Sequence, residues 1–121
     1  MLRIAVPVDR NNENCNIFEH FGRAPYYMLV DVENKEIKRI SFVENILVEH
    51  GPGDIPRMLK EHGVNILICL GIGRRAKIFF QQYGIEIVSG VEGRALDAIR
   101  MFLEGKLVSR EYTPPRKWHE R

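Results

Sequence analysis

The sequence has few cysteines, and none of them stands in a metal-binding pair. Cys15 and Cys69 are its two cysteines, and neither belongs to a CxxC motif. This absence excludes the local ligand pattern of a closed tetrahedral zinc site. Cys69 lies within ILICL and is expected to be a small buried hydrophobe, and a structural disulfide is not expected.

Long hydrophobic runs are also lacking. The longest, such as VNILICLGIG, are far shorter than the roughly 20 apolar residues that cross a bilayer. The first ten residues, MLRIAVPVDR, reach Asp9 without a long apolar segment before a small-residue cleavage site. We therefore expect a cytoplasmic protein without a membrane partner.

Acidic residues are slightly fewer than basic ones. The formal net charge is +2, and residues 110–121 hold four basic and two acidic residues, so residues 1–109 are balanced with 14 of each. Such a body has no strong field for nucleic acid. We expect a single α/β domain over residues 1–109 and a Pro-containing basic tail over 110–121, because TPPRK continues neither a helix nor a strand.

Apolar runs and periodic stripes alternate along the body. β-branched runs predict strands at 2–8, 26–32, 37–43, 64–70 and 85–88. Stripes at i, i+3 and i+4 predict helices within GPGDIPRMLKEHG, GIGRRAKIFFQQYG and EGRALDAIRMFLEG, the first with Asp54 as its N-cap and Gly63 as its stop. The order β-β-β-α-β-α-β-α indicates one mixed sheet with helices on its faces.

Ligands of open α/β sheets bind beyond the carboxyl ends of the strands. Three loops are expected to meet there, 9–24, 45–53 and 71–74, if the third strand runs parallel to the first. These loops hold Cys15, His20, Arg23, His50 and Arg74. His50 precedes GPG and therefore lies in a loop.

The stretch EHFGRAP, residues 19–25, is the most distinctive of these loops. An isolated histidine is usually an ordinary surface ring, although it can also be a metal ligand or a general base. Around His20, Gly22 permits a sharp turn, Pro25 sets the entry into a strand, and Arg23 offers five donors to an anion. Together they predict a short rigid corner that presents two polar groups.

The stretch GIGRR, residues 71–75, marks a strand-to-helix turn. Gly71, Gly73 and Arg74 suit an anion at a helix N-terminus. The dinucleotide pattern GxGxxG fails because residue 76 is alanine. A small-anion or nucleotide-binding regulatory module is therefore the alternative function, and tight strand–helix packing is an equally good reason for the two glycines.

Hydrolytic chemistry has little support. Asp9 closes the first predicted strand and Asp31 lies on the second, but no further carboxylates converge on them by obvious spacing, as two-metal nucleases require. No serine lies in a nucleophile elbow.

Four segments carry a resemblance to a known family: RIAVPVD, FEHFGRAPYYMLVDVE, the Asn-bearing VEN, and LICLGIGRRAKIFFQQYGIEIV. In this order and spacing they resemble the dinitrogenase iron–molybdenum cofactor biosynthesis family over about residues 2–104. The resemblance implies a three-layer α/β/α sandwich of ribonuclease H-like topology. Its mixed five-stranded sheet would have the order 3-2-1-4-5, with strand 2 antiparallel.

The resemblance also implies a function. It suggests a non-enzymatic carrier of iron–molybdenum cofactor or an iron–sulfur precursor, with a cofactor donor or acceptor protein as a partner. His20 and Arg23 would face the cluster, which suits a neutral imidazole on a metal and a guanidinium on an anionic periphery. Cys15 would add a thiolate to iron if its side chain reached the same place, and His50 would assist.

Overall fold

The computed structural model describes residues 1–46, 51 and 53–110. Its elements follow the predicted order, and a 3-10 turn at Phe21–Arg23 precedes the second strand. They are β1 (Leu2–Val8), β2 (Tyr26–Glu33), β3 (Glu36–Glu44), α1 (Asp54–Glu61), β4 (Ile66–Ile68), α2 (Arg74–Gln82), β5 (Glu86–Val88) and α3 (Ala95–Leu103). β4 is shorter than the predicted strand 64–70. The expected tail lies, apart from Arg110, outside the described residues.

The five strands form one mixed sheet in the order β3-β2-β1-β4-β5. β2 is antiparallel to β1 and β3, whereas β4 is parallel to β1 and β5. This confirms the predicted order and the antiparallel second strand. The carboxyl ends of β1, β3, β4 and β5 therefore share one edge of the sheet with the start of β2, and we call it the carboxyl edge.

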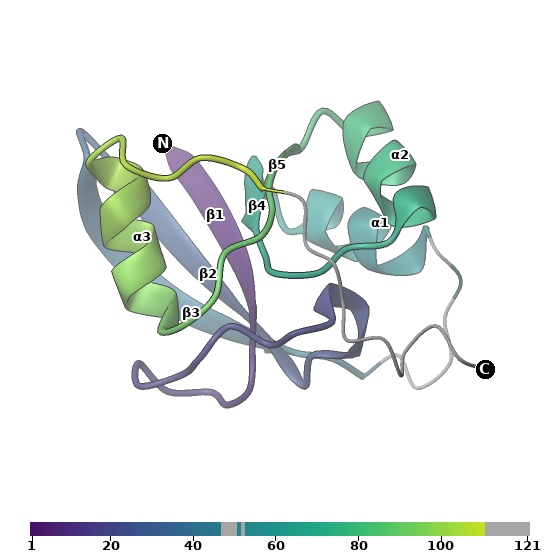
Figure 1. The fold of residues 1–121 in the computed structure, drawn as a ribbon, viewed down its shortest axis with the longest axis horizontal. Coiled ribbons are helices and arrows are strands. Elements are labelled where there is room, and N and C mark those ends of the chain that lie inside the picture. Colours follow the sequence, from purple (N-terminus) through teal and green to yellow (C-terminus); the bar gives the residue numbers. More distant parts are fainter. Residues whose placement is uncertain (47–50, 52, 111–121) are drawn as a thin grey trace.

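Helices cover both faces of the sheet, so the molecule has three layers. In Figure 1, α3 lies on one side of the sheet and α1 and α2 lie on the other. Val6 and Ile68 belong to the core beneath α3, while Ala5 and Leu67 belong to the core beneath α1 and α2. Successive strand residues point to opposite faces, which is why the apolar runs of β1 and β4 are buried throughout.

The first helix begins one residue away from where the sequence places it. Asp54 was expected to be the N-cap, but Gly53 occupies that position and Asp54 is the first helical residue. Its Oδ2 accepts a hydrogen bond from the Gly51 N–H at 2.9 Å, and a carboxylate in the first turn favours the helix dipole. Gly63 follows the helix with φ of +76°, which confirms it as the stop.

At the opposite edge of the sheet, an ion pair joins β1 and β2. Arg3 donates from Nε and Nη2 to the two Asp31 oxygens at 2.7 and 3.1 Å, and from Nη1 to the His62 carbonyl at 2.7 Å. The hydrogen bond from Arg3 lowers the pKa of Asp31. Asn65 accepts from the Arg3 N–H and donates its own N–H to the Arg3 carbonyl, both at 2.8 Å. β1, β2, the end of α1 and the start of β4 are thus joined at one point.

Within residues 1–46, 51 and 53–110, no helix is long and apolar enough to span a bilayer.

Candidate functional site

Two of the predicted loops touch at the carboxyl edge. His20 forms a parallel bridge with Gly71. The Phe21 N–H donates to the Gly71 carbonyl at 3.2 Å, and the Gly71 N–H donates to the Glu19 carbonyl at 3.0 Å. Residues 20–25, which we call the corner, therefore lie directly against residues 71–75, which we call the glycine turn. The expected convergence of these two loops is observed.

The corner is anchored in the core through Phe21. Its ring packs edge-to-face on Phe80 with 5.6 Å between centroids, and its carbonyl accepts a 2.5 Å hydrogen bond from the Tyr27 hydroxyl. Burial raises the pKa of Tyr27, so this hydroxyl remains a donor at neutral pH. The Arg23 N–H closes the 3-10 turn on the His20 carbonyl at 3.1 Å. The predicted rigid corner is thus a 3-10 turn built on a buried aromatic ring.

Asn45, just after β3, holds the other half of the corner. Its Nδ2 donates to the carbonyls of Ala24 at 2.9 Å and Gly22 at 3.4 Å, and its N–H donates to the Pro25 carbonyl at 2.9 Å. Asn45 was not among the predicted site residues. Its signal in the sequence was an asparagine that closes the third strand, within the VEN segment.

The predicted site residues differ in their exposure to solvent. His20 is half-buried, whereas Arg23, Gly73 and Arg74 are exposed. Gly73 caps α2 with φ of −74°, and a Cβ there would meet nothing within 4 Å. Tight packing therefore does not explain Gly73. The first turn of α2 holds no acidic residue, so the charge of Arg74 is unopposed within that turn.

A cavity of about 340 Å³ adjoins both motifs. Its walls come from the corner, from the start of α1 and from the start of α2. They comprise Phe21, Gly51, Ile55, Gly73, Arg74, Arg75 and Ala76. The lining of the cavity is mainly apolar, and its two arginines belong to the start of α2, where a helix N-terminus favours an anion.

Cys15 lies on the other face of the sheet from Phe21 of the corner. It is fully buried in the core beneath α3, with its Sγ 3.9 Å from the Met28 Sδ. Burial raises its pKa, which disfavours the thiolate that a metal needs. The side chain of Cys15 is therefore not exposed beside His20, and its predicted role as a ligand stays a prediction. Cys69 is buried as predicted, and burial raises its pKa to about 12.

The described residues do not form a closed metal site. No group of three or more His, Cys, Asp and Glu side chains within them could hold an ion. His50, the other predicted helper, lies outside the described residues. Of the two predicted metal ligands, His20 is thus the one that the fold brings to the glycine turn.

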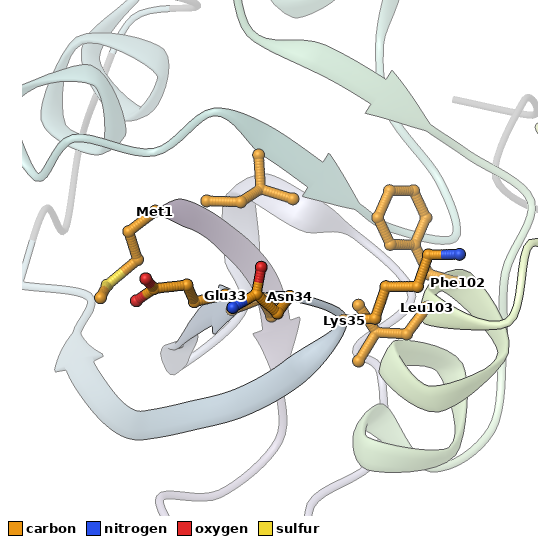
Figure 2. Close-up of a pocket in the computed structure, with 8 residues that line it drawn as sticks. Met1, Glu33, Asn34, Lys35, Phe102 and Leu103 are labelled. Carbon is orange, nitrogen blue, oxygen red and sulfur yellow. The ribbon is translucent and has the colours of Figure 1, made fainter.

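A second hollow lies at the opposite end of the sheet. It measures about 630 Å³ and opens between the β2–β3 turn, the N-terminus and the end of α3. Figure 2 shows Met1 and Glu33 on one side of it and Lys35, Phe102 and Leu103 on the other. None of the predicted site residues lines this hollow.

Fold and site together define the class: a small three-layer α/β protein with a histidine–arginine corner against a glycine turn at the carboxyl edge. The model of the family described as dinitrogenase iron–molybdenum cofactor matches residues 2–105. The chain therefore belongs to this family.

The chain is also similar to several known proteins. The chain is 36% identical over 110 residues to the protein MJ0580 of Methanocaldococcus jannaschii, covering 88% of this chain and 90% of that protein. The crystal structure of PH0822 is 41% identical with a TM-score of 0.81, covering 90% of this chain and 96% of that one. The apo form of the orange protein from Desulfovibrio gigas is 24% identical with a TM-score of 0.79, covering 95% and 98%, and shows the shared fold.

Proposed function

We propose that this protein binds an iron–molybdenum or iron–sulfur type cofactor, or its precursor, as a non-catalytic carrier. The observation that supports it best is the backbone bridge between His20 and Gly71. It joins the corner to a helix N-terminus that bears Arg74. His20 is the proposed metal ligand, and Arg23 and Arg74 offset the negative charge of the cargo.

The donor set fits a cargo that arrives already assembled. A metal–sulfur cluster carries its own bridging sulfides, so a single imidazole and two guanidinium groups are enough to hold it weakly. Weak holding suits a carrier, which must also pass its cargo to an acceptor protein. Cys15 is left out of this ligand set because it is buried.

Anaerobic reconstitution tests the proposal. The apo-protein is incubated with a preformed iron–sulfur cluster held by small thiolate ligands, and the iron that co-elutes on gel filtration is measured. His20→Ala is expected to retain about tenfold less iron than the unsubstituted protein, since its metal ligand is gone. His62→Ala is the matched control, because this exposed histidine caps α1 at the opposite edge. Equal iron in His20→Ala and the unsubstituted chain would rule out His20 as the ligand.

The small-anion or nucleotide module remains the second candidate. It is favoured by the cavity beside Gly73, Arg74 and Arg75. If this is the function, phosphate compounds raise the melting temperature, Arg74→Gln abolishes the rise, and the preformed cluster has no effect. If the unsubstituted protein retains iron and His20→Ala does not, the result supports the carrier function instead.

A further inference from the structure

We propose that Asn45 is a positioning residue that sets the His20–Arg23 corner for its ligand. The inference rests on the proposed function for the nature of that ligand, an anionic metal–sulfur cluster. It rests on the described contacts for the positioning itself.

The carbonyl groups of the corner show how much Asn45 contributes. The His20 carbonyl accepts from the Arg23 N–H, and the Phe21 carbonyl accepts from the Tyr27 hydroxyl. Three more carbonyl groups of the corner have described partners, and all three accept hydrogen bonds from Asn45. These are the carbonyls of Gly22 and Ala24, bound by its side-chain amide, and that of Pro25, bound by its N–H.

The two halves of the corner therefore have different anchors. Phe21 is held by Gly71, by Phe80 and by Tyr27, all of which belong to the interior. The half from Gly22 to Pro25 is held from the end of β3 by Asn45. Arg23 is exposed within this second half, and its backbone lies between the two carbonyls that the Asn45 side chain binds.

The chemistry of a carboxamide suits this place. Its NH2 group has two N–H donors and can serve two carbonyl oxygens at once. Those oxygens carry partial negative charge, which would repel an anionic cluster if they turned toward it. Aspartate has nearly the same shape but would set a carboxylate against both carbonyls, and serine could serve only one of them.

Two substitutions of Asn45 and one elsewhere separate positioning from simple stabilisation. Asn45→Asp and Asn45→Ser are compared with Asn65→Ala. Asn65 also binds a neighbouring strand through one side-chain and one backbone hydrogen bond, both to Arg3, but at the opposite edge of the sheet. Thermal denaturation verifies that each variant is folded, and Asn45→Ser keeps the test open should the aspartate variant fail to fold.

The first readout needs no cluster. The imidazole Cε1–H resonance of His20 is followed by NMR across pH, with His20→Ala identifying it. Both Asn45 variants are expected to move this resonance, because the Arg23 N–H donates to the His20 carbonyl and so links His20 to the half of the corner that Asn45 holds. Asn65→Ala is expected to lower the melting temperature and leave the resonance in place. Resonances unchanged in both Asn45 variants, or moved equally by Asn65→Ala, would overturn the positioning role.

The second readout is the affinity for the same preformed iron–sulfur cluster. Asn45→Ser is expected to weaken it about tenfold, because binding must then also reorder the corner, and Asn45→Asp to weaken it further. Asn65→Ala is expected to bind like the unsubstituted protein. Undiminished binding by both Asn45 variants would contradict the proposal. If the unsubstituted protein retains no iron, the carrier function fails, while the NMR comparison still decides whether Asn45 positions the corner.

Discussion

At the scale of single residues, burial separates the groups that can meet a ligand from those that cannot. His20 is half-buried and Arg23 exposed, whereas Cys15 is fully buried although it precedes His20 by only a few residues. Its thiol lies against Met28 in an apolar core, where the ionised form is costly. Closeness in the sequence therefore does not expose Cys15 beside His20.

Cys15→Ala is accordingly expected to retain iron as the unsubstituted protein does. It should lower the free energy of unfolding by about 1–2 kcal/mol, because the loss of the sulfur leaves a small void in the core. Iron co-elution and urea denaturation measure the two effects. A folded Cys15→Ala that has lost its iron would return Cys15 to the ligand set.

At the scale of elements, the segment after α3 returns to the carboxyl edge and lies beside the end of β5. The Arg110 N–H donates to the Ser89 carbonyl at 2.8 Å, and the Ser89 N–H donates to the Ser109 Oγ at 3.0 Å. Gly90 permits this approach, since a Cβ there would stand 2.6 Å from the Arg110 carbonyl oxygen. Its φ of +76° is also costly for any other residue.

Gly90→Ala is therefore expected to lower the free energy of unfolding by about 2–4 kcal/mol, since backbone strain and a steric clash add together. Gly84→Ala is the matched control: φ is +74°, but a Cβ would meet nothing within 4 Å. Gly84→Ala should lower the free energy of unfolding by only about 1 kcal/mol, because backbone strain acts there without a steric clash. Urea denaturation compares the two, and equal losses would show that the contact with Arg110 does not matter.

At the scale of the whole molecule, the two edges of the sheet have different roles. The carboxyl edge gathers the corner, the glycine turn and the exposed arginines. The opposite edge joins strands and helix through Arg3 and Asp31, whose side chain is only 10% exposed. Stability and the proposed binding can therefore be altered separately.

The lowered pKa of Asp31 makes global stability depend on pH. The unfolded carboxyl binds a proton near its ordinary pKa of about 4, while the folded one stays ionised beside Arg3. This contribution is thus present above about pH 4 and is lost as the pH falls through the lower, folded pKa. Asp31→Asn should reduce the free energy of unfolding by about 1–3 kcal/mol at neutral pH and flatten its decline in acid.

Urea denaturation between about pH 3 and pH 7 measures this effect. Asp97→Asn is the control, because its pair with Arg100 is 3.7 Å apart and well exposed, which is worth less than about 1 kcal/mol. An acid decline that Asp31→Asn leaves as steep as before would assign the pH dependence to other carboxyl groups.

The sequence by itself determined the order of the elements, the sheet that buries both faces of β1 and β4, and the two motifs of the site. These features depend on local periodicity and on glycine and proline, whose effects act over a few residues. The family resemblance added the strand order. The start of α1 was misplaced by one residue because a helix boundary depends on cap geometry that composition does not specify.

Only the tertiary structure decided which side chains meet. It turned Cys15 into the core, left open space around Gly73, and brought Asn45 from the end of β3 onto the corner. Each of these outcomes depends on contacts between segments far apart in the chain. The direction of a loop side chain follows from what packs against it, and no local pattern of residues carries that information.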